Sequence, residues 1–160
     1  MTARLRNVLL LAALVPLVGC DHATKWAAKE ALEDRPPRQL LGRALELTYA
    51  ENTDVAFNLL RWVPEKVRLP ALLALGALAL IALLVLTART ERRWPRAALL
   101  LLTAGAAGNH LDRLARGYVV DFIHVPHWPV FNVADAYVVA GAVLLAFVGW
   151  RTQSPAASST

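Results

Sequence analysis

Apolar residues gather into four blocks along this chain, and polar or charged residues border each block. A helix needs about 20 mostly apolar residues to cross the hydrocarbon core of a bilayer, which is about 30 Å thick. The block from Leu69 to Ala88 contains no charged residue, and its Pro70 falls in the first helical turn, where proline is tolerated. This block is predicted to form a transmembrane helix.

The other three blocks are shorter and run from Val8 to Cys20, from Ala97 to Leu111 and from Ala136 to Trp150. A helix of about 15 residues covers only about 22 Å, so each block must draw its flanking polar residues to the membrane interface. Ionisable groups held near hydrocarbon are costly and point to a functional site. The residues drawn in this way are Asp21, Asn109, Asp112, Arg113, Asn132 and Asp135.

This pattern predicts an all-α polytopic membrane protein, a single membrane domain with four transmembrane helices. The spans are expected at about 6–26, 68–89, 95–113 and 132–151. Four crossings place both termini and the Arg-rich tip 89–96 on one side of the membrane. The segment 27–67 and the connection between the last two spans then share the other side.

The segment 27–67 carries the signals of a small extracytoplasmic β element. Residues 38–49 alternate enough to predict a strand, and residues 55–60 are expected to pair with it after a turn at Asn52-Thr53-Asp54. The tail 152–160 is rich in Ser and Ala and is expected to be disordered.

The composition agrees with a membrane protein and excludes other classes. Among 160 residues 57% are hydrophobic and only 18% are charged, which fits neither a disordered chain nor an ordinary soluble domain. The formal net charge is +5, but 14 of the 17 basic residues are Arg spread along the chain without a basic stripe, so no nucleic-acid partner is expected. The single cysteine, Cys20, allows no intramolecular disulfide.

Basic residues suggest which side of the membrane is cytoplasmic. Arg4, Arg6 and the four Arg of 89–96 place the termini in the cytoplasm. The segment 21–68 has eight basic residues of its own, offset by eight acidic ones. The positive-inside rule counts basic residues alone, so the eight basic residues of this segment weaken the argument for this orientation.

The same topology gathers carboxylates from separate parts of the chain at the non-cytoplasmic face. Asn132 and Asp135 are three residues apart and share a helix face, while Asp121 lies in the short connection before them. Two carboxylates in a poorly hydrated site share one proton, so that one acts as base and the other as acid. This pairing suits hydrolysis of a peptide bond by an activated water, with nearby Asn and Arg side chains orienting the scissile carbonyl.

Four short motifs resemble those of the lipoprotein signal peptidases, the prokaryotic type II signal peptidases. The stretch Ala104-Gly-Ala-Ala-Gly-Asn-His-Leu-Asp-Arg113 is similar to the family pattern G-G-A-x-G-N-x-x-D-R. Val119-Val-Asp-Phe122 resembles V-V-D-F, and Phe131-Asn-Val-Ala-Asp135 resembles F-N-x-A-D. Asp21-His-Ala-Thr-Lys25 is similar to the D-x-x-S/T-K at the end of the first span. Together the motifs cover essentially the whole chain in order.

The resemblance implies an intramembrane aspartic endopeptidase of the bacterial inner membrane, with its active site toward the extracytoplasmic face. Its substrates would be diacylglyceryl-modified prolipoproteins, cut immediately before the lipidated cysteine, and membrane lipids would surround a monomer without metal or organic cofactor. The catalytic pair falls on Asp121 and Asp135. The substrate-binding residues fall on Asn52, Asn109, Arg113 and Asn132. The supporting residues are Asp21, Lys25, Asp112, Gly105 and Gly108.

The chain departs from the family pattern at three places. Asp54 stands where the pattern N-x-G-x-A-F has glycine, in Asn52-Thr-Asp-Val-Ala-Phe57, and adds a carboxylate near the expected site. Ala104 replaces the first glycine of its motif. The connection from Asp121 to Asn132 is shorter than the family pattern leads us to expect. These departures bear on substrate preference more than on the chemistry.

Two other functions fit parts of the sequence. Leu17-Val-Gly-Cys20 after an apolar run resembles a lipobox, which would make the chain itself a lipoprotein processed at Cys20. A small proton-coupled transporter using Asp121 and Asp135 as a relay fits the hydropathy. His124 and His127 beside Asp121 suggest a metal site, but the intervening Pro126 prevents a regular helical arrangement of the two rings.

Overall fold

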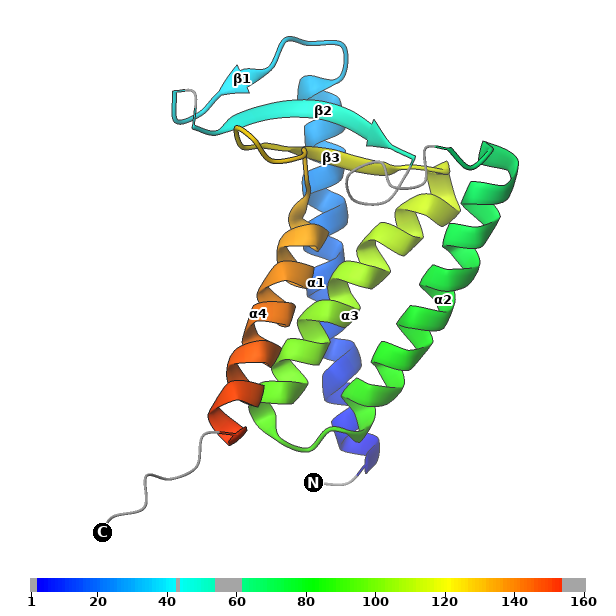
Figure 1. The fold of residues 1–160 in the computed structure, drawn as a ribbon, viewed down its shortest axis with the longest axis vertical. Helices are drawn as coiled ribbons and strands as arrows, with labels where there is room; N and C mark the ends of the chain where they lie inside the picture. The colour runs from blue at the N-terminus through cyan, green and yellow to red at the C-terminus, as the bar shows by residue number, and fades with distance from the viewer. Residues whose placement is uncertain (1–2, 43, 54–61, 154–160) are drawn as a thin grey trace.

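Four long helices lie side by side, and a small sheet covers one end of the bundle (Figure 1). The structure is a computed structural model and describes residues 3–42, 44–53 and 62–153. The helices are α1 (Ala3–Leu32), α2 (Glu65–Arg89), α3 (Arg93–Arg116) and α4 (Val133–Gln153). The strands are β1 (Arg38–Gln39), β2 (Glu46–Asn52) and β3 (Val119–His124).

The predicted small sheet is present, but its strands differ from those expected. It has three antiparallel strands in the order β1-β2-β3, with Ala50 opposite Asp121 and Asn52 opposite Val119. The expected single strand 38–49 is a hairpin, because Leu40 donates its N–H to the carbonyl of Leu45 and closes a turn. The expected partner strand 55–60, with Asp54, lies outside the described residues, and β3 takes the place beside β2.

α1 is longer than the span predicted for it and reaches the sheet. It continues to Leu32, although the extracytoplasmic segment was expected to begin at residue 27. Ala28 and Leu32 are buried on one side of this extension and form a small core with Phe122 of β3. The apolar spacing of four residues explains the added turns, because it keeps one helix face against the sheet.

At the other end, the helix α4 continues to Gln153, so the first two residues of the tail expected to be disordered are helical.

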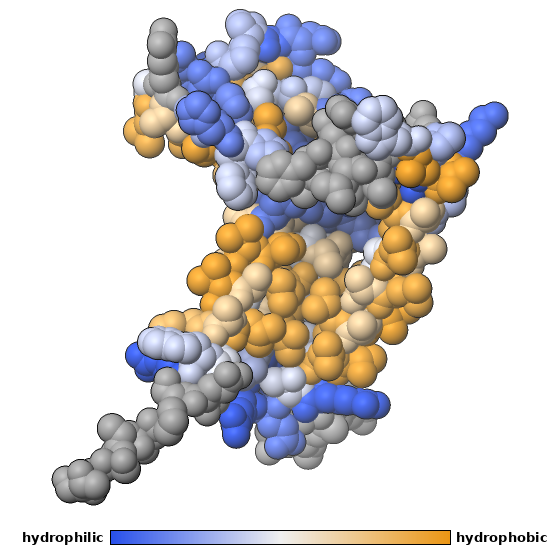
Figure 2. Space-filling view, in the orientation of Figure 1, coloured by the Kyte–Doolittle hydropathy of each residue, from blue (hydrophilic) through white to orange (hydrophobic). Residues whose placement is uncertain are grey.

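Three of the four helices are long and apolar enough to cross a membrane, considering only the described residues. These stretches are Val8–Leu32, Lys66–Arg89 and Val133–Arg151. Large apolar side chains on them, such as Val15, Leu78 and Val143, are each more than 60% exposed. On the face that Figure 2 shows, apolar residues form a band between two polar ends.

α3 is not among these three helices, and it is more polar than they are, with four Arg and one Asp along its length. It contacts each of the other three helices and so occupies the middle of the bundle. Small buried residues allow this packing. An added Cβ on Gly105 would collide with the carbonyl oxygen of Ala134, and one on Gly108 would collide with the carboxylate of Asp21. Both glycines therefore set how closely α1 and α4 approach α3.

Candidate active site

Asp121 lies in the middle of β3, the strand that pairs with β2. Its residue is 3% exposed, and the antiparallel register places it opposite Ala50, two residues before Asn52 on β2. From there the Asn52 side chain donates from Nδ2 to Asp121 Oδ2 at 2.9 Å. The sheet register thus brings an amide from the segment after α1 onto a carboxylate from the connection after α3.

Asp135 lies in the first turn of α4, next to the residue that caps this helix. The backbone N–H of Asp135 donates to Asn132 Oδ1 at 3.0 Å, and the backbone N–H of Asn132 donates to Asp135 Oδ2 at 3.2 Å. The two residues therefore cap each other in the manner of a capping box. This fixes the carboxylate of Asp135 at the end of α4 that meets the sheet.

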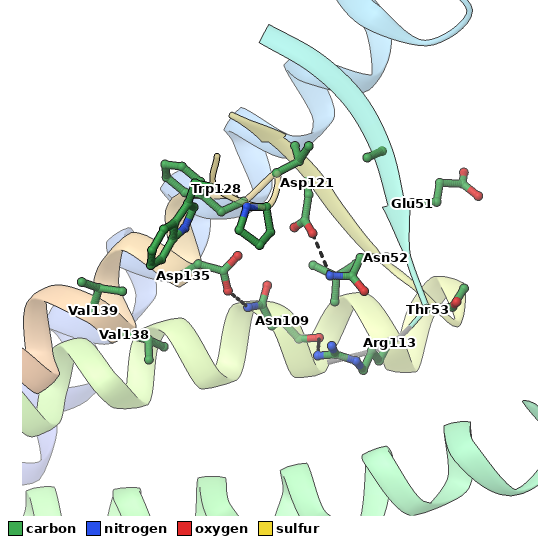
Figure 3. Close-up of a pocket in the computed structure, with 15 residues that line it drawn as sticks. Glu51, Asn52, Thr53, Asn109, Arg113, Asp121, Trp128, Asp135, Val138 and Val139 are labelled. Atoms are coloured by element: carbon green, nitrogen blue, oxygen red, sulfur yellow. Dashed lines mark hydrogen bonds between the residues drawn. The ribbon is translucent and has the colours of Figure 1, made fainter. Parts of the chain in front are cut away.

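Two amide side chains connect the carboxyl groups of Asp121 and Asp135. Asn132 Nδ2 donates to Asp121 Oδ1 at 2.6 Å and to Asn109 Oδ1 at 3.1 Å. Asn109 Nδ2 in turn donates to Asp135 Oδ1 at 2.7 Å. Figure 3 shows both carboxyl groups facing the same space, with Asn109 below them on α3 and Asn52 beside Asp121.

This space is a cavity of about 660 Å³ beneath the sheet. One part is polar and is lined by Asn52, Thr53 and Arg113. The opposite part is apolar and is lined by Trp128, Pro129, Val130, Val138 and Val139. Asp121 and Asp135 lie between the two parts (Figure 3). A ligand with one polar and one hydrophobic portion therefore fits with its junction at the carboxyl groups.

The pKa of Asp121 is raised to about 6, chiefly because burial disfavours its charged form. The negative charge of Asp135 raises this pKa further, while hydrogen bonds from Asn52 and Asn132 lower it. A carboxyl group with a pKa near neutrality can hold a proton and release it within one reaction cycle.

A buried ion cluster lies behind Asn109. Lys25 Nζ is 2.8 Å from Asp21 Oδ2 and 2.9 Å from Asp112 Oδ2, and all three side chains are fully buried. Asp21 Oδ1 also accepts the backbone N–H of Ala134 at 2.9 Å. The cluster thereby joins α1 to α3 and to the start of α4, directly beside Asp135.

The structure brings all of the sequence-predicted site residues to one region. Asp121, Asp135, Asn52, Asn109 and Arg113 line the cavity. Asn132 is fully buried behind the two carboxyl groups, and Asp21, Lys25, Asp112, Gly105 and Gly108 lie in the packed layer around Asn109. The neighbour position Asp54 falls outside the described residues.

The apolar side of the cavity was not predicted from the sequence. Val138 and Val139 follow Asp135 by three and four residues, so helical spacing alone would have placed them on its face. Trp128 and Pro129 give no such signal, because they reach the cavity only through the loop between β3 and α4. The side chain of His124 contacts Glu46, with 3.2 Å between His124 Nδ1 and Glu46 Oε2. It does not pair with His127 as a metal site would require.

The arrangement of two carboxyl groups, one of them with a raised pKa, around a partly apolar cavity suits acid–base hydrolysis. One group can take a proton from a water molecule while the other supplies a proton. The amides of the three Asn side chains and the guanidinium of Arg113 supply donors for a polar substrate group.

Comparisons with known proteins give peptidases as relatives of this chain. A family model described as signal peptidase (SPase) II matches residues 13–151. A protein named lipoprotein signal peptidase from Anaeromyxobacter sp. (strain Fw109-5) is 36% identical, over 86% of this chain and 82% of its own. Proteins of the same name from Moorella thermoacetica and Acaryochloris marina are 35% and 33% identical and cover 92% and 98% of this chain, with 93% and 98% of their own lengths matched.

A solved structure of a bacterial membrane enzyme has the same fold. It superposes with a TM-score of 0.81 over 95% of this chain and 94% of its own, at 24% sequence identity.

Proposed function

The chain belongs to the signal peptidase II family, and from this premise we propose that it cleaves diacylglyceryl-modified prolipoproteins immediately before the lipidated cysteine. The relatives that support this are lipoprotein signal peptidases by name. The comparisons lend no support to a proton-coupled transporter or to a lipoprotein precursor processed at Cys20. The protein is a multi-pass membrane peptidase.

The catalytic groups in this proposal are Asp121 and Asp135. The observation that carries it is the bridging by Asn132, whose side chain donates to Asp121 at 2.6 Å and whose backbone N–H donates to Asp135 at 3.2 Å. One residue thus touches both carboxyl groups, so they face one cavity and can address the same water molecule. The enzyme is accordingly an aspartic endopeptidase.

The surroundings of the two carboxyl groups assign them different starting roles. Asp135 accepts N–H donors on both oxygens, which hold the carboxyl group in place to act as the base. Asp121 carries the proton, because burial raises its pKa.

Hydrolysis then follows in two steps. Asp135 takes a proton from water as the water oxygen attacks the scissile carbonyl carbon, and Asp121 donates its proton to the carbonyl oxygen. When the tetrahedral intermediate collapses, Asp135 gives its proton to the nitrogen of the departing cysteine, and Asp121 recovers the proton of the hydroxyl. The enzyme returns to its starting state, and one water has been added across the peptide bond.

The remaining cavity residues position the substrate. Arg113 and Asn52 lie on the polar side and suit the backbone carbonyls around the scissile bond. Asn109 and Asn132 hold the carboxyl groups and leave their relative geometry fixed before the substrate arrives. The apolar side, with Val138 and Val139, suits the signal helix or the lipid chains.

The proposed membrane topology has four transmembrane helices, with α3 as the fourth. α3 lies parallel to the other helices and is shielded by them, so it needs less apolar surface than they do (Figure 1). The sheet and the cavity are then extracytoplasmic. Both termini and the turn between α2 and α3 are cytoplasmic, in the inner membrane of a bacterium. A monomer contains the whole proposed site.

The function is tested with the purified full-length enzyme and a diacylglyceryl-modified prolipoprotein. Asp121→Asn and Asp135→Asn are each expected to lower kcat by on the order of 1,000-fold or more, since each removes one proton carrier. Asp34→Asn is the matched control, because Asp34 is exposed and its positive φ of 57° is tolerated by Asn. Near-normal cleavage by either folded site variant would show that the aspartate pair is wrong.

The lipoprotein alternative is tested on the same preparation. Intact mass spectrometry of the purified protein is expected to find residues 1–19 attached, whereas loss of this segment would indicate processing before Cys20.

A further inference from the structure

The fully buried ammonium of Lys25 takes no part in the hydrolytic steps above. A single residue, Asn109, separates it from Asp135. Lys25 Nζ contacts three oxygens at nearly equal distances. Two belong to carboxylates, Asp21 Oδ2 at 2.8 Å and Asp112 Oδ2 at 2.9 Å. The third is the neutral amide oxygen of Asn109, at 2.9 Å.

The contact with Asn109 is not needed to balance the charge of Lys25. Two carboxylates already surround the ammonium, and the outer oxygen of Asp112 has His22 at 3.5 Å and Arg116 at 3.8 Å in addition. A neutral amide adds no charge to this cluster. Its place beside the ammonium therefore calls for a different explanation.

An ammonium group has three N–H donors and no acceptor, so it fixes which end of the Asn109 amide faces it. The carbonyl oxygen must point to Lys25, and the NH2 group must point the other way. In that orientation Nδ2 donates to Asp135 Oδ1 at 2.7 Å. A flipped amide would place NH2 against the ammonium and an oxygen against the carboxylate, and both contacts would be repulsive.

The Asn132 side chain supports the same orientation from the opposite side. It donates to Asn109 Oδ1 at 3.1 Å while it also donates to Asp121. Asn109 Oδ1 therefore has one donor from the ion cluster and one from the site. Lys25 is the donor that comes from outside the cavity.

We propose that Lys25 is a positioning residue for the hydrolysis: its ammonium orients the Asn109 amide so that the NH2 group holds the carboxyl group of Asp135 facing the cavity. This inference rests on the proposed function, because it assigns a task to a residue that touches neither water nor substrate. It differs from a purely structural role, in which Lys25 only neutralises Asp21 and Asp112.

The two roles separate when the charge is restored without the lysine. Asp21, Asp112 and Lys25 carry a formal charge of −1 together, from two acids and one base. Lys25→Met changes this to −2 and is expected to destabilise the fold. Adding Asp112→Asn returns the charge to −1 but leaves Asn109 without its ammonium. The double variant K25M/D112N is compared with D112N alone, in which Asp21 and Lys25 sum to a charge of 0, so the two variants differ by the positive charge of Lys25.

The measurement is steady-state cleavage of a diacylglyceryl-modified prolipoprotein by the full-length enzyme, with thermal unfolding of each variant. We expect K25M/D112N to be less stable than D112N, because the buried Asp21 loses its cation. Measured on the folded enzyme, its kcat should be on the order of 10- to 100-fold lower, since a misplaced base slows hydrolysis without weakening binding. KM should change by about twofold or less. The alkaline limb of the pH profile should move to higher pH, because the positive charge of Lys25 lowers the pKa of Asp121 and is absent from this variant.

A second lysine of the same helix provides the matched control. Lys29 lies one turn further along α1, its side chain is 38% exposed, and it faces Glu33 at 3.5 Å. Lys29→Met makes the same chemical change away from Asn109 and should leave kcat and its pH profile unchanged. Equal kcat and pH profiles for K25M/D112N and D112N would overturn the proposal and leave Lys25 with a structural role.

Lys25→Arg keeps the proposal testable if the double variant does not fold. It retains the charge, but the wider guanidinium fork cannot contact all three oxygens from one point. We expect a stable protein with kcat at least tenfold lower, and normal kcat in this variant also overturns the proposal. Failure of the proposed function looks different, because Asp121→Asn or Asp135→Asn would then remain active.

Discussion

Asn132 and Asp135 cap each other at the start of α4, with backbone-to-side-chain hydrogen bonds of 3.0 and 3.2 Å. The same Asn132 side chain also donates to Asp121 at 2.6 Å. Asn132, which caps α4 from the position before its first residue, therefore also joins the two catalytic candidates. A helix cap and a site bridge are combined in a single side chain, and variants can separate these tasks.

Asn132→Ser is expected to keep the cap and lose the bridge. Serine caps helices about as well as asparagine, so the free energy of unfolding should change by only a few tenths of a kcal/mol. The NH2 donor to Asp121 is lost, and kcat should fall by roughly 100-fold.

The companion variant Asn132→Ala loses both the cap and the bridge. It should be destabilised by about 1 kcal/mol relative to Asn132→Ser in chemical denaturation, with a similar kcat. If Asn132→Ser cleaves normally, the bridge has no catalytic value.

The pH dependence of cleavage should follow the proton on Asp121. This group must be protonated at the start, and its pKa is raised to about 6, so kcat/KM should decrease as the pH rises through about 6. Asn52→Ala removes a hydrogen bond that favours the charged form. Its loss raises the pKa of Asp121, and the alkaline limb of kcat/KM should move to higher pH. A limb that stays in place or moves to lower pH contradicts this assignment.

The raised pKa of Asp121 also makes stability depend on pH. Folding stabilises its protonated form, so this contribution is complete below the unfolded value of 3.8 and is lost as the pH rises through about 6. The Asp121→Asn variant has no carboxyl group to ionise at this position, so it does not lose stability in this way as the pH rises. The variant should therefore gain about 2 kcal/mol relative to the native chain between pH 4 and pH 8. Thermal unfolding at the two pH values checks this, and Asp34→Asn should show no such gain.

Gly108→Ala is expected to disturb both the packing and the site. The added methyl group would meet the Asp21 carboxylate and the Ala134 side chain, and overpacking of this kind costs about 1–3 kcal/mol. Because Asp21 binds the N–H of Ala134 beside Asp135, kcat should also fall. Gly19→Ala is the control, since nothing lies within 4 Å of its added Cβ. Unchanged stability of Gly108→Ala would show that α3 can move away from α1.

The sequence predicts the helices of this protein well, because long apolar blocks leave few alternatives. It also predicts the meeting of Asp121 and Asp135, since the number of crossings decides which polar edges share a side. The strand β3 was missed because Val119 and Val120 are both buried, so the run around Asp121 lacks the alternation of a half-exposed strand.

The contacts that connect the site are harder to predict from the sequence. Lys25 and Asn109 are separated by 84 residues, and their contact depends on how closely α1 and α3 approach. The motifs mark both residues but do not show that they touch. The Trp128 wall of the cavity likewise depends on the path of one loop.

The cavity changes from polar to apolar across the two carboxyl groups. Val138 and Val139 lie on one side of Asp135, along α4, whereas Arg113 and Thr53 lie on the other side, near the end of β2 (Figure 3). Under the proposed function, the severed signal helix then lies against the apolar part of the cavity and the new amino terminus lies against its polar part.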